Sequence, residues 1–325
     1  MKLRTLAQLC TALVFGASVQ LASAATDRPE CIAPAKPGGG FDLTCKLAQS
    51  GLQDTKTISE PMRVTYMPGG IGAVAYNAVV AQRPSDGNAI VAFSGGSLLN
   101  LALGKFGKYN ENDVRWLAAV GTDYGMVAVR ADSPFKTLKD LMVALKQDPT
   151  KVVFGAGGTV GSQDWTKAAL VAKAAGVDPK TFRFVAFEGG GEAFTALLGG
   201  HVHVVSGDAS EAASQLQAGK IRVLAVLADE RLPGLLANIP TAKEQGYNVS
   251  WPIIRGYYMG PKVSDADYKY WVDAFNKMLA TKEFAKLREE RELFPFAKTG
   301  ADLDAYVKKA VPEYRKIAAE LGLVK

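Results

Sequence analysis

The chain has 325 residues, of which 48% are hydrophobic, and carries a formal net charge of +6 at pH 7. This apolar content supports a large core and excludes an intrinsically disordered chain. Because the positive charge is mild and no stripe of Lys and Arg alternates with aromatic residues, the composition argues against nucleic-acid binding.

The first 24 residues have the pattern of a secretory signal peptide. Lys2 and Arg4 supply positive charge, the segment 6–21 is mostly apolar, and Ala22-Ser23-Ala24 is a typical cleavage site. The apolar run is shorter than the roughly 20 residues that a membrane-spanning helix needs. We therefore expect residues 1–24 to be removed on export. Removal of two positive charges leaves a mature chain of about +4.

The stretch 33–42 (APAKPGGGFD) predicts the end of a buried strand, a glycine-rich turn and the start of a helix that runs to about Leu52. Three consecutive glycines let the backbone approach a small anion closely. The helix N-terminus would direct its unpaired N–H groups at that anion. Gly39 and Gly40 are therefore candidate ligand contacts.

Three side chains in this stretch have two interpretations each. Lys36 could pair with a carboxylate or face solvent. Phe41 could form a wall of the pocket or pack in the core. Asp42 could cap the helix, or it could shape the amide groups around a ligand.

The next hundred residues repeat the unit of strand, glycine turn and helix. A strand over 62–66 enters Pro68-Gly69-Gly70 and a helix that ends near Gln82. A strand over 89–93 then enters Ser94-Gly95-Gly96-Ser97 and a short helix through Leu103. This alternation predicts a parallel sheet with helices on its faces.

The pattern resumes after a connection. We expect strands over 126–129, 152–154, 182–187, 203–206 and 221–227, with helices that begin at Thr137 or end near Ala174, Leu198 and Ala218. A polar connection follows over 233–246. The chain should close with a strand over 257–260, a long helix from Asp265 to about Glu292 and a helix over 301–321 that Pro312 kinks.

Six strand-to-helix turns thus contain glycine, three before residue 100 and three after residue 150. In open parallel sheets, ligands bind outside the carboxyl ends of the strands. Two lobes with three such turns each could close on one small anion. The later turns add the candidates Gly158, Thr159, Ser162, Gly189, Gly190 and Asp208.

Enzyme and metal motifs are absent or incomplete. The sequence has no G-x-x-x-x-G-K-[ST] and no complete G-x-G-x-x-G after a strand, and Ser94 lacks the first glycine of G-x-S-x-G. A secreted α/β hydrolase using Ser94 or Ser162 remains the alternative of a different class. His201 and His203 share one strand face but have no further ligands nearby, so we expect no metal site and no cofactor.

Export would leave two cysteines, Cys31 and Cys45, in an oxidising compartment. Such a pair usually forms a disulfide, and two free buried thiols are the alternative. A bridge would close a loop of about 15 residues and contribute roughly 3 kcal/mol in the chain-entropy model.

The order of several motifs resembles one known family. These motifs are PAKPGGGFD (34–42), PGGIG (68–72), GAGGTVGS (155–162), EGGGEA (188–193), LLGGH (197–201), GKIRVLAV (219–226) and IPT (239–241). Together they resemble the solute-binding component of tripartite tricarboxylate transporters, the Bug-type periplasmic receptors. The resemblance covers essentially the whole mature chain.

The resemblance implies an α/β, type II periplasmic-binding-protein fold with two parallel or mixed-sheet lobes and a central ligand cleft. Lobe 1 would comprise residues 25–126 and 248–325, and lobe 2 would comprise 127–247. The protein would be a periplasmic monomer that delivers a small carboxylate to membrane permease subunits. Backbone amides would hold the ligand at Gly39, Gly40, Phe41, Asp42, Pro68, Gly69 and Gly70, followed by Ser94, Ser97, Thr159 and Ser162.

Two departures from the family pattern affect the expected specificity. Phe187-Glu188-Gly189 stands where many members have an aromatic residue, Lys and Gly, so a cation is lost on the second lobe. Lys36 stands where many have Ala, so a cation is gained on the first. Lys36 together with Cys31 and Cys45 resembles the citrate-binding members most. A dicarboxylate, aromatic or amino-acid carboxylate is the alternative ligand.

Overall fold

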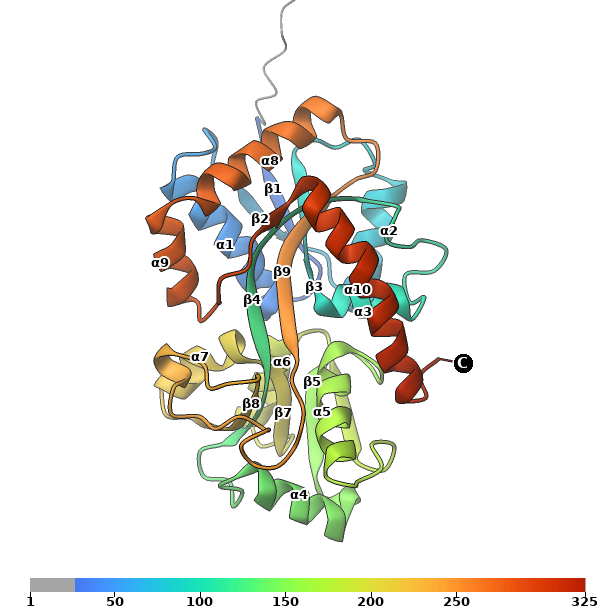
Figure 1. Cartoon of the computed structure of the whole chain (residues 1–325), viewed down its shortest axis with the longest axis vertical. Coiled ribbons are helices and arrows are strands. Elements are labelled where there is room, and N and C mark those ends of the chain that lie inside the picture. The colour runs from blue at the N-terminus through green and yellow to red at the C-terminus, as the bar shows by residue number, and fades with distance from the viewer. Residues whose placement is uncertain (1–26, 325) are drawn as a thin grey trace, which may run out of the picture.

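Two lobes stacked end to end make up the molecule (Figure 1). The structure, a computed structural model, describes residues 27–324, so the predicted signal peptide lies outside the described residues. Among residues 27–324, no helix is both long and apolar enough to cross a membrane.

The first lobe, the upper one in Figure 1, is built on a parallel set of three strands in the order β2-β1-β3. Glycine turns follow these strands and lead into helices, as the sequence predicts. The strands and helices of this part are β1 (Glu30–Ala33), α1 (Gly40–Asp54), β2 (Arg63–Tyr66), η1 (Gly70–Gly72), α2 (Ala73–Ala81), β3 (Ala89–Ser94) and α3 (Gly95–Ala102).

The second lobe repeats this construction with β7-β5-β6 as its parallel set. Its elements are α4 (Leu138–Gln147), η2 (Pro149–Lys151), β5 (Val153–Gly157), α5 (Gln163–Ala174), β6 (Arg183–Phe187), α6 (Gly190–Leu198), β7 (Val204–Asp208), α7 (Ala209–Gln217), β8 (Ile221–Leu227) and η3 (Gly234–Leu236).

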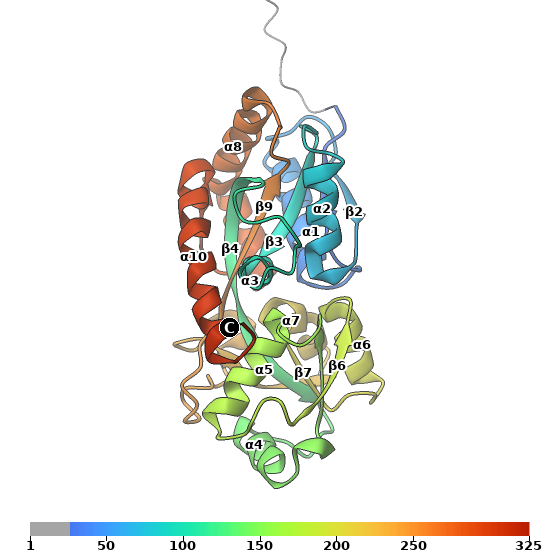
Figure 2. The same ribbon diagram turned by 90° about the vertical axis from the view of Figure 1, so that its right-hand side faces the viewer.

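The chain then returns to the first lobe. The returning elements are β9 (Pro252–Met259), α8 (Asp265–Leu279), α9 (Lys282–Glu290), β10 (Lys298–Thr299) and α10 (Gly300–Glu320). In Figure 2, α10 runs along one side of the first lobe and reaches the second. There the Lys173 side chain of α5 donates to the Glu320 carbonyl at 3.2 Å.

The lobes are joined by the long strand β4 (Arg115–Arg130), which belongs to both (Figure 1). Its first part, through Tyr124, pairs antiparallel with β9. From Gly125 onward it pairs with β7 on one side and β8 on the other. The pairing of β4 with β9 extends as far as Tyr124 and Pro252, so both strands cross the waist of the molecule.

Three predicted elements differ from the structure. The strand predicted over 126–129 is only the end of β4, and the strand predicted over 257–260 is the end of β9, which begins at Pro252. Polar residues such as Asp123 and Arg255 interrupt the apolar pattern of both strands, so the pattern predicted only part of each strand. The predicted helix 265–292 is two helices, because the Thr281 hydroxyl caps a new one by accepting from the Phe284 N–H.

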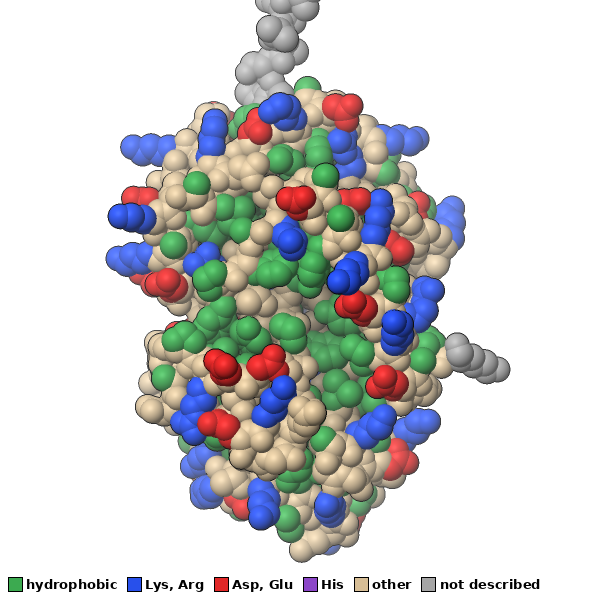
Figure 3. Space-filling view, viewed as in Figure 1, with side chains coloured by type: hydrophobic (Ala, Val, Ile, Leu, Met, Phe, Trp, Pro, Cys, Tyr) green, Lys and Arg blue, Asp and Glu red, His purple; other side chains and the backbone are tan. Residues whose placement is uncertain are grey.

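Each lobe has its own hydrophobic core on both faces of its strands. In the first lobe, Trp116 packs edge-on against Phe93 and Tyr258. In the second, Trp165 and Phe154 are buried with the helices that cover the sheet. On the face seen in Figure 3, hydrophobic side chains gather at the waist between the lobes, whereas charged side chains are spread over the rest.

Candidate ligand-binding cleft

Two cavities lie between the lobes where the glycine turns meet. The larger has a volume of about 460 Å³ and the smaller about 40 Å³. Ile71, in the turn after β2, lines both. Its φ of 45° places a β-branched residue in the left-handed region, which is a strained conformation. The Asn100 side chain donates to the Ile71 carbonyl at 3.1 Å and holds this turn.

Two helix N-termini, one from each lobe, face each other at the smaller cavity. Helix α1 begins at Gly40 and α6 begins at Gly190. A Cβ atom added to Gly39 would lie 3.2 Å from the Gly190 nitrogen, so the two backbones approach closely. Unpaired N–H groups and the positive ends of two helix dipoles therefore converge on one point.

The carboxylate of Glu211, from the first turn of α7, occupies this point. Its Oε1 atom accepts the N–H of Gly40. A Cβ on Gly190 would lie 2.0 Å from its Oε2 atom, so only glycine leaves room for the carboxylate there. Oε2 is buried and has no hydrogen-bond partner among the described residues. Burial, together with the neighbouring Asp208 and Asp164, raises the pKa of Glu211 to about 8.

A buried ionic network lies beneath Glu211. The Lys167 ammonium donates to Asp208 and to the Gly207 carbonyl, and pairs with Asp164 at 2.8 Å. The Arg255 guanidinium bridges Asp123 at 2.7 Å and Asp208 at 2.5 Å. The network therefore joins α5, β7, β4 and β9, which come from both lobes.

The carboxylates of this network differ in how many of the two cations they pair with. Burial alone would raise the pKa of Asp208, but Lys167 and Arg255 together hold it below its ordinary value. Burial raises the pKa of Asp123 and of Asp164, each of which has only one of these cations as its partner. Asp208 is thus the carboxylate that both cations stabilise in its charged form.

The larger cavity opens between the turns at Gly70 and Gly158. Its lining also includes Lys105, which follows α3. Glu188, in the turn before α6, and Glu192, in the first turn of α6, line it from the second lobe. The Lys105 ammonium reaches across the cleft and donates to the Val160 carbonyl at 3.1 Å. Burial lowers the pKa of Lys105. No carboxylate within salt-bridge distance pairs with Lys105 in the described part of the chain.

Most of the residues predicted from the sequence lie at these two cavities. Gly39, Gly40, Phe41, Ser94, Gly189, Gly190 and Asp208 line the smaller one. Gly70, Gly158, Thr159 and Ser162 line the larger one. Lys36, Asp42, Pro68, Gly69 and Ser97 line neither.

Three of the residues outside the cavities hold the site together. The Lys36 ammonium pairs with Glu192 of the opposite lobe at 2.7 Å. Asp42 is not the N-cap of α1, which is Gly39; its carboxylate accepts the Gly38 N–H at 2.8 Å and the Tyr66 hydroxyl at 2.8 Å. The Ser97 side chain accepts the Ser94 N–H at 3.2 Å, as the second half of a capping box on α3.

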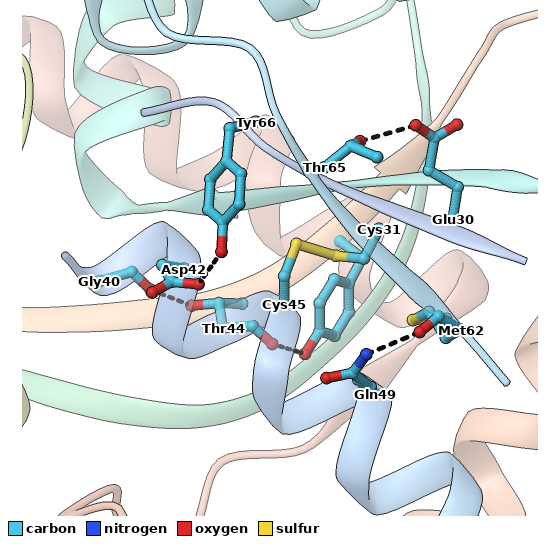
Figure 4. Close-up of a disulfide and its surroundings, with 11 residues drawn as sticks. Glu30, Cys31, Gly40, Asp42, Thr44, Cys45, Gln49, Met62, Thr65 and Tyr66 are labelled. Atoms are coloured by element: carbon cyan, nitrogen blue, oxygen red, sulfur yellow. Dashed lines mark hydrogen bonds between the residues drawn. A yellow bond between two sulfur atoms is a disulfide. The ribbon is translucent and has the colours of Figure 1, made fainter. Parts of the chain in front are cut away.

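The predicted Cys31–Cys45 disulfide is present and joins β1 to α1 (Figure 4). Both cysteines are fully buried. Figure 4 also shows the Tyr66 hydroxyl directed at Asp42, one turn of α1 before Cys45. The strand and the helix that flank the first glycine turn are therefore fixed relative to each other.

Of the charged residues at the site, sequence reasoning found Asp208 but missed Glu211, Lys167 and Arg255. Glu211 follows Asp208 at the spacing of an ordinary helix start, and Lys167 lies in a helix of mixed composition. Arg255 had the clearest signal, because it is a single arginine within an apolar, β-prone run over 251–259. Even so, the run gives no indication of which carboxylates the arginine meets.

A family model described as "Tripartite tricarboxylate transporter family receptor" matches residues 46–323. A curated relative from Cupriavidus necator, "UPF0065 protein in gbd 5'region", is 24% identical over 298 residues, which is 89% of this chain and 85% of the relative. A second, from Agrobacterium vitis, is 28% identical over 250 residues, 76% of this chain and 69% of the relative.

Solved structures show the same fold. MatC from Rhodopseudomonas palustris with bound malate has a TM-score of 0.79 at 20% identity, covering 89% of this chain and 98% of that one. A second R. palustris protein, with adipate, has a TM-score of 0.79 at 19% identity, covering 91% and 97%. The predicted two-lobed, α/β periplasmic-binding-protein fold is therefore confirmed.

Proposed function

The chain belongs to the tripartite tricarboxylate transporter receptor family, and from that premise we propose that it is a periplasmic solute-binding receptor for a small carboxylate. The best candidate ligand is citrate or another tricarboxylate. The receptor would deliver its ligand to the membrane permease subunits of a tripartite transporter. The family is one of receptors rather than enzymes.

One observation carries this proposal: glycine turns from both lobes meet at the cavities between them. A carboxylate there would receive backbone N–H groups at the starts of α1 and α6, which is the arrangement that helix termini offer to anions. The cavity of about 460 Å³ has room for the rest of a small organic acid.

We propose that the lobes close on the ligand by a hinge in the two crossing strands. The proposed division at 126/127 and 247/248 falls near the point where β4 changes partners, at Gly125, and just before β9 begins at Pro252. Strand termini and loops at such crossings absorb the backbone rotation of domain closure.

Dicarboxylates are the second candidate class. Two proteins of this fold are described with malate and with adipate. The amide groups of the turns recognise a carboxylate and not the remainder of its molecule, so they accept either class. Aromatic and amino-acid carboxylates are the further alternatives that the larger cavity would have to distinguish.

The proposal is tested by titration calorimetry of the mature protein, residues 25–325, with citrate, malate, adipate and glutamate. We expect saturable heat and a raised melting temperature with at least one of them. The absence of both effects with every di- and tricarboxylate would rule the proposal out.

The hydrolase alternative has less support. The Ser162 hydroxyl donates to the Gly157 carbonyl at 2.8 Å and accepts the Trp165 N–H, and the Ser94 hydroxyl accepts the Gly96 N–H at 3.1 Å. Helix capping thus accounts for both hydroxyl groups. Recovery of each bound acid unchanged after prolonged incubation would separate a receptor from an enzyme.

A further inference from the structure

The carboxylate of Glu211 stands where the proposed function places a carboxylate of the ligand. It accepts the N–H at the start of α1, and its other oxygen lies against the start of α6. The space beside Glu211 amounts to about 40 Å³, room for one or two water molecules. A ligand carboxylate that reaches these N-termini must therefore meet Glu211.

The charges around Glu211 make the approach of a ligand carboxylate electrostatically unfavourable. Four carboxylates, those of Asp123, Asp164, Asp208 and Glu211, share two cations, Lys167 and Arg255. With Glu211 ionised, a ligand carboxylate would be a fifth negative charge in a setting of low dielectric constant. The network has no spare cation, because Lys167 and Arg255 are each bound to two carboxylates.

The charged groups on the solvent side of Glu211 do not compensate the excess negative charge. A shallow groove there is lined by Asp42 and Lys46 of α1 and by Glu290, Arg291 and Glu292 at the end of α9. Lys46 already pairs with Asp42 at 2.9 Å. Of these five groups three are acidic, so the groove adds no net positive charge to Glu211.

We propose that Glu211 is a ligand-site residue that takes up one proton when a carboxylate binds. The protonated side chain is neutral and can donate its O–H to the incoming carboxylate, which replaces repulsion by a hydrogen bond. This inference rests on the proposed function and adds to it a proton that accompanies the ligand.

The titration of Glu211 supports this role. Its pKa of about 8 without ligand means that the side chain is half protonated near pH 8, and an adjacent carboxylate would raise the pKa further. Binding at pH 8 should then take up about half a proton, and at pH 9 nearly one. Affinity should fall as the pH rises through this range, by up to tenfold per pH unit above the pKa of the free protein.

The test is calorimetric titration of the mature protein with malate and with citrate, in two buffers that differ in ionisation enthalpy. The difference in apparent heat gives the number of protons taken up. We expect uptake near pH 8 for the wild type. Glu211→Gln, which resembles the protonated side chain, should show none and should have nearly constant affinity between pH 7 and 9.

A matched control is Glu283→Gln, at an exposed position on α9. It should retain the wild-type uptake. If Glu211→Gln does not fold, the uptake of the wild type measured against pH still tests the inference, because uptake must increase as the pH rises and Glu211 of the free protein ionises. Binding without uptake, or unchanged uptake in Glu211→Gln, would overturn the inference and leave the proposed function standing. No binding of any carboxylate would overturn both.

Discussion

Lys167 is a buried cation that pairs with two carboxylates. Its side chain is fully buried, and it pairs with Asp164 and Asp208 below the cleft. Removing one partner of a buried ion pair leaves uncompensated charge, at a cost of about 3–5 kcal/mol. We expect Lys167→Met to lower the free energy of unfolding by that amount in a urea titration.

The control for this variant is Lys173→Met, six positions later and still within α5. Lys173 is exposed, and its ammonium donates to the Glu320 carbonyl at the end of α10. An exposed contact of this kind contributes little, so the loss should stay below about 1 kcal/mol. Equal losses in the two variants would mean that the buried charge of Lys167 contributes no more to stability than the exposed charge of Lys173.

Lys105 is the cation most available to the remainder of a ligand. It lines the larger cavity, where its acceptor is a carbonyl and not a carboxylate. A second carboxylate on the ligand would be the stronger acceptor. We expect Lys105→Gln to weaken malate binding roughly three- to tenfold and to leave acetate binding nearly unchanged.

Lys108 provides the comparison for Lys105, because it follows three residues later and places its ammonium over the Tyr109 ring. Lys108→Gln should bind malate as the wild type does. If Lys105→Gln weakened acetate and malate by the same factor, Lys105 would be acting on lobe closure and not on the second carboxylate.

The difference between Gly190 and Glu211 explains which residues the sequence could predict. A glycine turn between a strand and a helix has a local cause, so Gly39, Gly40 and Gly190 could be placed at the cleft in advance. Glu211 and Arg255 acquire their roles from partners that are 40 or more positions away, and Lys167 joins its near neighbour Asp164 to Asp208, 41 positions away. No local pattern encodes such distant partners, which is why Glu211, Lys167 and Arg255 were missed.

At the scale of elements, the disulfide fixes the first glycine turn between β1 and α1. Cys31 and Cys45 are 14 positions apart, so the bridge restricts the unfolded chain by roughly 3 kcal/mol. We expect the double variant Cys31→Ala, Cys45→Ala to melt about 5 °C below the wild type in scanning calorimetry.

The readout that separates stability from function in this variant is ligand affinity at a temperature well below melting. The amides of Gly39 and Gly40 also depend on Asp42, whose carboxylate accepts the Gly38 N–H. We therefore expect affinity to change little. A large loss of affinity would show that the disulfide positions the turn itself.

Elements whose residues pack locally were predicted well, and elements that serve both lobes were not. The units of strand, turn and helix in each lobe follow from apolar runs and glycines. Strands β4 and β9 carry polar residues at the waist, where Asp123 and Arg255 meet each other. Their full lengths depend on a contact between distant parts of the chain, so sequence patterns showed only their apolar ends.

At the scale of the whole molecule, the lobes are in contact across the cleft. Lys36 reaches Glu192, Gly40 reaches Glu211, and Lys105 reaches the Val160 carbonyl. These contacts come from two segments of the first lobe, the turn between β1 and α1 and the segment that follows α3. The described conformation is thus a closed one, and a hinge at β4 and β9 would have to break all of these contacts to open.

Gly191, the second residue of α6, offers a way to separate closure from folding. A Cβ added there would lie 2.9 Å from the Gly38 carbonyl carbon and 2.9 Å from the Pro37 oxygen, both backbone atoms of the opposite lobe. Within its own lobe, alanine suits a helical position better than glycine does. We expect Gly191→Ala to fold normally, to populate an open form and to have a larger radius of gyration in small-angle X-ray scattering.

Gly189→Ala is the matched comparison, since its backbone is extended and an added Cβ would meet the opposite lobe no closer than 3.5 Å. Its scattering should match that of the wild type. With saturating ligand, the wild type and Gly189→Ala should remain compact. Gly191→Ala should stay expanded, because ligand binding cannot remove the steric clash between its Cβ atom and the backbone of the opposite lobe. A compact Gly191→Ala protein would mean that the two turns can slide past each other, and closure would then not depend on the contact between Gly38 and Gly191.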